Sequence, residues 1–268
     1  YNALTANSSG SSNTALGFES LCKNTASNNT AVGAYSLRDS TTGSNNVAVG
    51  ISALKENTEG DNNTSIGNSS LCNNTTADNN TAVGHSALKT NTTGTCNVAM
   101  GVNALTANTT GNNNVAIGFC ANATAVDRND NTAIGFEALK LNTAVGNTAV
   151  GKAAADSNTT AEGITAIGNR ALCSNTTGAN NTAVGMCSLL ANTTGADNTA
   201  VGCGALDANT TADCNTAVGQ RSLTTNTTGS KNTAIGRTSL EANTTGDSNV
   251  AIGCGAGALT TTGACNVF

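Results

Sequence analysis

The stretch Asn181-Thr182-Ala183-Val184-Gly185 recurs, with small changes, along the whole 268-residue chain. We call its closing glycines the marker glycines, and they follow one another every 17 residues except for two intervals of 16. A period held through the whole chain indicates a solenoid, in which each repeat stacks on the next. The sequence therefore predicts one repeat domain, residues 1–268, and not a two-domain enzyme. The marker glycines are Gly17, Gly33, Gly50, Gly67, Gly84, Gly101, Gly118, Gly135, Gly151, Gly168, Gly185, Gly202, Gly219, Gly236 and Gly253.

Each repeat begins after its marker glycine with two variable residues, followed by Ala-Leu or Ser-Leu. Two more variable residues lead to Asn-Thr-Thr-Gly, and another two lead to the closing segment. That segment is Asn, then Thr or Val, then Ala, then Val or Ile, then the next marker glycine. The Thr or Val position and the Val or Ile position lie two residues apart, so in a strand both point to the same side. Because both positions exchange mainly β-branched residues, we expect that side to face inward. The glycines and the Asn-Thr-Thr-Gly segments favour tight turns and leave no room for a helix.

These features predict an all-β fold, a single parallel β-solenoid or β-roll of about sixteen 17-residue coils with two short strands in each coil. With strands about 4.8 Å apart, the coils would form a rod on the order of 75 Å long. The pattern is irregular around residues 119–165, because residues 119–130 lack both Ala-Leu and Asn-Thr-Thr-Gly. We expect an expanded turn or bulge there, or a join between two blocks of repeats.

A column of leucines recurs four residues after most marker glycines. If these side chains face inward, they complete the core of each coil, and this is the arrangement that we expect. If they face outward, they form an apolar stripe too long to leave in water, and the rod must associate with copies of itself. The column comprises Leu21, Leu37, Leu54, Leu71, Leu88, Leu105, Leu139, Leu172, Leu189, Leu206, Leu223 and Leu240, to which we add Leu259, six residues after Gly253.

Composition excludes several classes of function. Charged residues make up 10% of the chain and the net charge is -5. This weak acidity, with Lys and Arg scattered singly, argues against a nucleic-acid partner. No apolar stretch is long enough to insert into a membrane, and residues 1–20 show no secretion signal. Ten cysteines without enough acidic and histidine partners for metal binding fit an oxidising compartment, so we expect an extracellular protein on a cell or virion surface.

The pattern Asn-Thr-Ala-Val-Gly-x-x-Ala-Leu-x-x-Asn-Thr-Thr-Gly resembles the head repeats of YadA-like trimeric autotransporter adhesins and related repeats in phage tail fibres. The resemblance covers essentially the whole chain. It implies a left-handed parallel β-roll, three copies of which associate into a head that binds collagen or cells. The resemblance identifies no ligand-binding residue in this sequence.

Many repeats carry an Asn-x-Thr or Asn-x-Ser sequon at the same turn. Used as glycosylation sites, these asparagines would place a stripe of sugar along one edge of the rod. Alternatively, their side-chain amides form a ladder between neighbouring turns, which needs no sugar. The candidate glycosylation sites are Asn7, Asn74, Asn91, Asn108, Asn158, Asn175, Asn192, Asn209, Asn226 and Asn243.

The cysteines can form bonds only within one coil or between adjacent coils, because a disulfide requires Cα atoms within about 7 Å. Two pairs meet this condition as candidate disulfides, Cys72 with Cys96 and Cys187 with Cys203. The others are either free thiols or bonds between subunits of a fibre. These candidate interchain cysteines are Cys22, Cys120, Cys173, Cys214, Cys254 and Cys265.

No constellation of catalytic or metal-binding residues emerges, and we predict a protein without enzymatic activity, metal or cofactor. His85 is the only histidine, and it stands at a variable turn position without the spacing of a zinc site. The acidic residues fall mostly in variable turns. The Gly255-Ala256-Gly257 segment follows a strand but opens no helix that could cradle a phosphate.

The function that fits these features is a rigid extracellular rod, serving as a fibre or filament subunit or as the shaft of a surface adhesin. Its partners would be copies of itself, joined laterally or head to tail, together with glycans or extracellular matrix. Both ends lack a polar cap, so Tyr1, Leu4, Val267 and Phe268 are the candidate end-to-end contacts. The alternative is an ice-binding solenoid, against which stands the expectation that the strand threonines point inward.

Overall fold

The computed structural model describes residues 1–268, which form strands and turns in two compact units. Unit 1 comprises Tyr1–Asn131 and unit 2 comprises Thr132–Phe268. The strands of unit 1 are β1 (Thr14–Leu16), β2 (Thr30–Val32), β3 (Val47–Val49), β4 (Thr64–Ile66), β5 (Thr81–Val83), β6 (Val98–Met100) and β7 (Val115–Ile117). Those of unit 2 are β8 (Thr132–Ile134), β9 (Thr148–Val150), β10 (Thr165–Ile167), β11 (Thr182–Val184), β12 (Thr199–Val201), β13 (Thr216–Val218), β14 (Thr233–Ile235) and β15 (Val250–Ile252).

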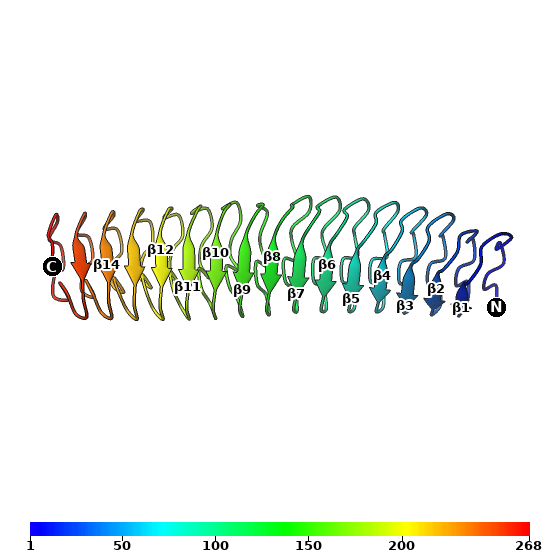
Figure 1. Cartoon of the computed structure of the whole chain (residues 1–268), viewed down its shortest axis with the longest axis horizontal. Coiled ribbons are helices and arrows are strands. Elements are labelled where there is room, and N and C mark those ends of the chain that lie inside the picture. Colours follow the sequence, from blue (N-terminus) through cyan, green and yellow to red (C-terminus); the bar gives the residue numbers. More distant parts are fainter. The chain divides into compact units, whose positions relative to one another are not determined.

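Within each unit every strand pairs in parallel with the next strand along the chain, so the coils stack in sequence order (Figure 1). The register keeps equivalent residues opposite each other, as Thr182 lies opposite Thr199 and Val184 opposite Val201. Further backbone hydrogen bonds join the same two coils away from the strands, from Leu189 N to Ala205 O at 3.0 Å and from Thr193 N to Thr210 O at 2.9 Å. The predicted all-β, parallel β-solenoid is confirmed.

Each coil holds one three-residue strand, so the prediction of two strands per coil was wrong, and the chain has fifteen strands where about sixteen coils were expected. The segment predicted as a second strand is a turn. Its backbone enters the left-handed region twice, at Cys187 (φ 55°) and at Leu189 (φ 49°) in a representative coil. A strand requires negative φ at successive residues, so this segment cannot extend. The sequence pattern hid the turn because leucine seldom adopts this conformation.

The strand side chains point opposite to the predicted direction. The central residue is buried in β2 to β15, and it is alanine in all of these strands except β4, which has Ser65. The first and third residues, such as Thr182 and Val184, are only partly buried and point away from the core. The prediction that the Thr or Val and the Val or Ile columns face inward was therefore wrong. Small alanines fit the narrow interior, and the larger β-branched residues lie on the surface.

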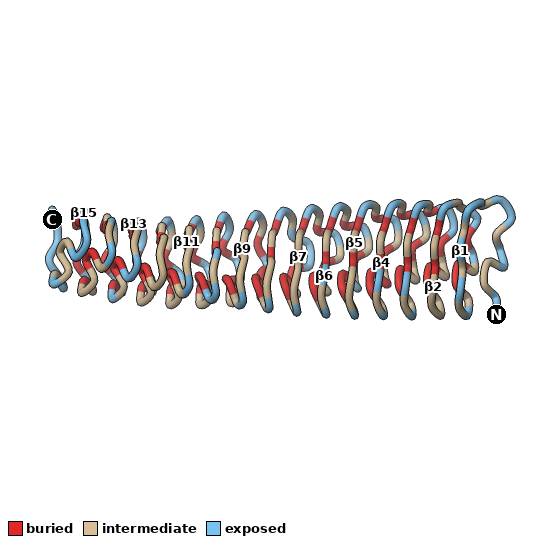
Figure 2. Tube along the Cα trace, turned by 60° about the horizontal axis from the view of Figure 1, so that its bottom comes forward, coloured by how far each residue is buried: buried red, intermediate tan, exposed pale blue.

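The core consists mainly of alanine, leucine and asparagine, with serine in place of alanine in several coils. Figure 2 shows the buried segments recurring from coil to coil. The inward orientation of the leucines is confirmed, because every leucine of the column from Leu21 to Leu240 is fully buried. The exception is Leu259, which is 92% exposed. Burying a leucine contributes about 1.5–3 kcal/mol, which offsets the strain of its left-handed backbone. The leucine column thus anchors the turn that replaces the predicted second strand.

Two columns of buried asparagines run along the stack. One column stands just before the strands and includes Asn198, whose backbone N–H donates to Asn181 Oδ1 at 2.9 Å. The other, which we call the turn asparagines, opens the Asn-Thr-Thr-Gly segments and includes Asn192. Its side chain donates to Asn175 Oδ1 at 2.8 Å and to Gly195 O at 2.9 Å, and Asn192 Oδ1 accepts from Asn209 at 2.8 Å. These bonds satisfy polar groups that burial would otherwise leave costly.

The repeats that depart from the regular sequence pattern fold into coils like the others. Residues 119–130 belong to unit 1 and form turns in the same order as the other coils, and Leu105 N donates to Ala121 O at 2.9 Å. The coils of 16 residues lose one residue from the turn that follows the buried asparagine. Asn24 therefore donates to Ala26 O, two residues ahead, at 2.8 Å, where a normal coil bonds three residues ahead. Variation in repeat length is thus absorbed in the outer turn.

Candidate functional surface

The strand face is the most regular surface of each unit, and we define it as the side chains of the first and third residues of the strands. The third position is aliphatic in most coils and reaches considerable exposure at Ile66 and Met100 (41% each) and at Ile252 (63%). No acidic or basic residue occupies either position in any strand. The result is an uncharged surface on which methyl groups and hydroxyl groups alternate.

The threonines of the strand face have free hydroxyl groups. In unit 2 the first strand position is threonine in seven successive strands, β8 to β14. The hydroxyls of Thr182 and Thr199 make no hydrogen bond within the protein. By contrast, the turn threonines use theirs along the stack, as Thr193 Oγ1 donates to Thr210 O at 3.1 Å. The strand threonines are therefore available to bind water.

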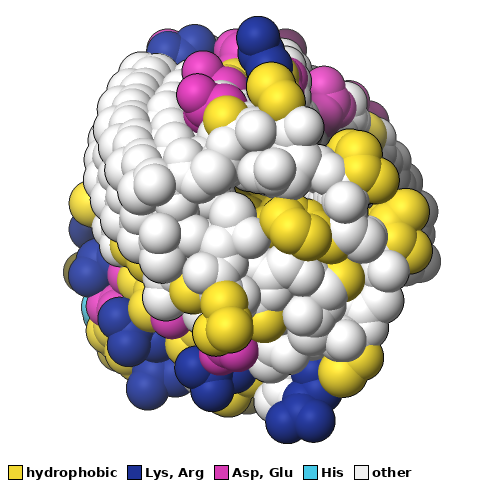
Figure 3. Space-filling view, turned by 90° about the vertical axis from the view of Figure 1, so that its left-hand side faces the viewer, with side chains coloured by type: hydrophobic (Ala, Val, Ile, Leu, Met, Phe, Trp, Pro, Cys, Tyr) yellow, Lys and Arg dark blue, Asp and Glu magenta, His cyan; other side chains and the backbone are white.

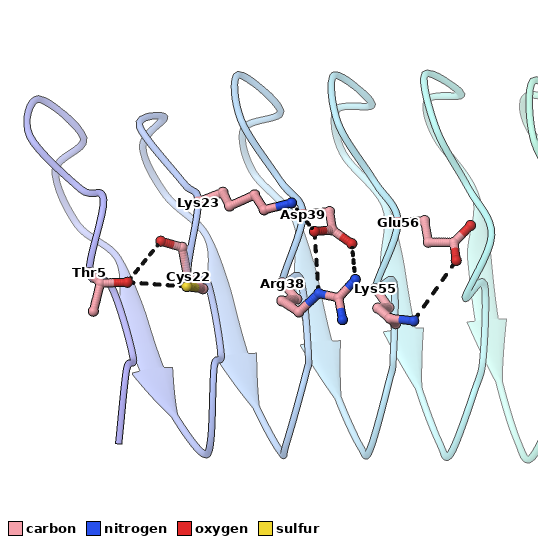
Figure 4. A network of polar contacts seen from close by, with 7 residues as sticks. All are labelled: Thr5, Cys22, Lys23, Arg38, Asp39, Lys55 and Glu56. Atoms are coloured by element: carbon pink, nitrogen blue, oxygen red, sulfur yellow. Dashed lines mark hydrogen bonds and ion pairs between the residues drawn. The ribbon is translucent and has the colours of Figure 1, made fainter.

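A patch of charge in unit 1 lies on the turns (Figure 4). Asp39 contacts Lys23 Nζ at 2.6 Å and Arg38 Nη2 at 2.6 Å, and Lys55 Nζ lies 3.9 Å from Glu56 Oε1. Partial burial alone would raise the pKa of Asp39, but the hydrogen bonds from Arg38 and Lys23 hold it below its usual value. Such pairs at the surface contribute little to stability. They do show that this charge is carried by turns.

The candidate glycosylation sites are almost all interior. Nine of the ten are fully buried turn asparagines, from Asn74 to Asn243, and Asn7 is partly buried. Between most neighbouring coils that both carry a turn asparagine, the amide groups form the ladder that was the alternative explanation of the sequons, as in the bond from Asn209 to Asn192. A glycan on these nitrogens would need room and hydrogen-bonding capacity that the folded coil does not offer. The folded units therefore display no surface stripe of these asparagines.

All ten cysteines are unbonded, so the two predicted disulfides are absent. Cys72 is buried and Cys96 is exposed, because they stand at different points around adjacent coils. Cys187 and Cys203 are also one position out of register: Cys187 donates its N–H to Asn169 O, whereas Gly204, not Cys203, donates to the coil that contains Cys187. Burial raises the pKa of the Cys72 thiol, which lowers its reactivity.

The candidate interchain cysteines lie at the surface to different extents. Burial raises the pKa of Cys173, whose Sγ donates to Asp156 Oδ1 at 3.3 Å, so this thiol is held in its protonated form. The remaining thiols are separated along the stack, and no two of them face each other in register. Cys214, Cys254 and Cys265 are exposed, and Cys22, Cys120 and Cys173 are partly buried.

Some of the candidate end-to-end contact residues already form contacts within their own unit. The ring of Tyr1 stacks on Phe18 with centroids 6.0 Å apart, and Leu4 N donates to Ser20 O. At the other end, Phe268 N donates to Val250 O at 2.9 Å. Figure 3 shows hydrophobic side chains exposed in the middle of this side, with acidic and basic side chains toward its top and bottom, and Val267 is 82% exposed.

Features of other site types are sparse. His85 is exposed in a turn. No pocket is found, and no three His, Cys, Asp or Glu side chains group as metal ligands. No helix is long and apolar enough to cross a membrane. In comparisons with known proteins, no family model matches the chain, and no curated protein matches it.

The strand face is what reasoning from the sequence missed. The signal was the alanine between the two β-branched positions, which is nearly invariant from repeat to repeat. A position that accepts only Ala or Ser is typical of close packing, whereas positions that exchange Thr, Val, Ile, Leu and Met tolerate varied surroundings.

Proposed function

We propose that this protein is a non-enzymatic structural element, a β-solenoid that serves outside the cell as a fibre subunit or as the shaft of an adhesin and associates with copies of itself. The main support is the set of hydrogen-bond ladders that joins each coil to the next. Around one coil of unit 2, bonds to neighbouring coils start from Thr182 N (2.8 Å), Leu189 N (3.0 Å) and Thr193 N (2.9 Å). The asparagine ladder adds side-chain bonds inside the same stack.

Such ladders suit a mechanical role. The bonds run between coils, and the buried leucines and asparagines lock the coils together from inside. Bending a unit would require many of these bonds to lengthen at once, so each unit is expected to be stiff. The uncharged strand face offers a surface on which copies can meet without removing charges from water. The resemblance to adhesin head repeats supports the adhesin form of this proposal.

Electron microscopy of the purified full chain tests this function. We expect straight filaments or lateral bundles, and we expect them to persist in reductant because the thiols are unbonded in the folded units. The control is the same sample at a concentration too low for assembly, which should show separate particles. Separate particles at every concentration would contradict the structural role, and loss of assembly in reductant would show that disulfides between subunits carry it.

Ice binding is the second candidate, and the outward direction of the strand threonines favours it. The expectation that had argued against this function was wrong, since Thr182 and Thr199 point away from the core. Parallel strands repeat about every 4.8 Å, so unit 2 presents methyl and hydroxyl groups at regular intervals. An array of this kind can order water at its own spacing.

Thermal hysteresis of the monomeric full chain tests the second candidate. The variant Thr199→Lys places a flexible charge in the middle of the threonine column and is expected to lose most of any activity. The matched control is Thr194→Lys, at an exposed turn position of the preceding coil, which should retain it. Wild-type protein without hysteresis, or equal loss in both variants, would contradict ice binding by this face.

A further inference from the structure

The strand face of unit 1 is a sheet face that no other part of the unit covers. Its third column carries large aliphatic side chains with considerable exposure: Leu16 (68%), Ile66 and Met100 (41% each) and Val49 (36%). Unit 1 contains no helix that could pack on them. Contiguous apolar surface of this kind is uncommon on a protein that works as a monomer.

The face is widened by the residue that follows the marker glycine. Ile51 is 54% exposed and Val102 is 42% exposed, and each stands two residues after an exposed member of the third column. Most exposed apolar side chains of unit 1 therefore stand at two positions of the repeat, the third strand position and the residue after the marker glycine. Asn68 and His85 interrupt the second of these columns. The aliphatic side chains concentrate on this part of the unit.

Charge is confined to other parts of the surface. The chain has 11 basic and 16 acidic residues, and none of them occupies the first or third position of a strand. A net charge of -5 makes two copies repel each other weakly. They can approach most closely where no charge must be removed from water, which is the strand face.

The regular spacing of side chains along the strand face indicates which kind of partner can pack on it. Equivalent side chains lie opposite each other in every strand pair, as Ile66 lies opposite Val83 and Val98 opposite Val115. The ridges and gaps of the face therefore repeat once per coil, about every 4.8 Å. A partner that fills successive gaps must carry the same repeat, and a second copy of this chain does. A partner without it would fit only a few coils.

We propose that the strand face of unit 1 is the surface on which a second copy of this chain docks, face against face, with its own strand face. This rests on the self-association in the proposed function and names the surface responsible. Two sheets that pack in this way lie about 10 Å apart, with their side chains interdigitated. Valine, isoleucine and threonine suit such a dry contact because their branched side chains lose little freedom when packed.

Sedimentation equilibrium of the full chain tests the proposal. The double variant Ile66→Lys with Met100→Lys places two charges in the interface, and we expect its dimer dissociation constant to rise at least about tenfold. The matched control, Thr76→Lys with Thr93→Lys, adds the same charge at exposed turn positions of unit 1 and should change the constant less than about twofold. Circular dichroism and urea titration establish that both variants fold as the wild type does.

A conservative pair guards against an effect of lysine on folding. Ile66→Thr with Met100→Thr keeps residue types that the face already carries, and it should weaken the dimer by an intermediate amount. Equal dissociation constants for the face and turn variants would overturn the proposed docking surface while leaving self-association, and thus the structural role, in place. A wild-type chain that stays monomeric would overturn both, and thermal hysteresis in that monomer would identify ice as what the face binds.

Discussion

Gly185→Ala is expected to lower the free energy of unfolding of unit 2 by about 3 kcal/mol or more. Gly185 has a φ of 133°, which side chains of L-residues rarely adopt, and a Cβ there would lie 2.7 Å from both C and O of Gly202 in the next coil. The coil of Gly202 cannot withdraw without breaking the hydrogen bond from Gly202 N to Val184 O, and Gly185 itself is held on its other side by the bond from its N–H to Ile167 O. Urea titration of the full chain measures the loss, and hydrogen exchange localises it to β11 and β12.

Gly146→Ala is the matched control for this variant. Gly146 also has a positive φ, 68°, but a Cβ there meets nothing within 4 Å. Only the cost of a left-handed alanine remains, about 1 kcal/mol. If both variants lose the same stability, backbone conformation alone sets the requirement for glycine, and the close approach of successive coils plays no part.

Asn192→Ala is expected to lower the free energy of unfolding of unit 2 by about 3 kcal/mol. The substitution removes the bonds from Asn192 to Asn175 Oδ1 and to Gly195 O, as well as the bond that Asn192 Oδ1 accepts from Asn209. Gly195 O keeps a donor, Asn181 Nδ2 at 2.7 Å, whereas Asn175 Oδ1 is left in the interior without one. A buried acceptor without a partner loses its hydration and gains nothing in return. Urea titration again gives the magnitude.

The exposed Thr194→Ala in the same turn is the control, and its effect should stay within about 0.5 kcal/mol. The natural sequence already contains two gaps in the ladder of unit 1, at Ser40 and at Ala125. Ala125 stands where an asparagine would donate, and Asn108 Oδ1 is buried without a partner. A loss for Asn192→Ala no greater than that of the control would mean that the asparagines fill space without contributing through their hydrogen bonds.

Most of the coil could be predicted from the sequence. The nearly constant distance between marker glycines predicted the parallel stack, and the recurrence of Leu189 and its equivalents indicated a buried column. The asparagine ladder followed as one of two explanations for the repeated Asn-Thr-Thr. In each case the same residue recurs in successive coils, so its neighbours in the stack are its own equivalents. Contacts between residues at the same position of successive repeats can therefore be predicted from the sequence of a single repeat.

The candidate sites were harder to predict, because they depend on position around the coil. The proposed pairing of Cys187 with Cys203 failed on a register difference of one residue, because Cys187 stands two residues and Cys203 one residue after its marker glycine. The sequons could not be distinguished from a ladder until burial was known. The free hydroxyl groups of the strand threonines were not predicted, because these threonines were assigned to the inner side of the strand.

The sequence by itself determined the period, the parallel stacking of the coils and the columns that line them. Only the tertiary structure decided which side of the strand faces inward. Alternation in a three-residue strand puts Thr182 and Val184 together and Ala183 opposite, but it favours neither side as the interior. That choice depends on the space inside the coil. The left-handed turns at Cys187 and Leu189 bend the chain sharply and keep this space narrow. The space that remains holds alanine, so the larger side chains form the surface.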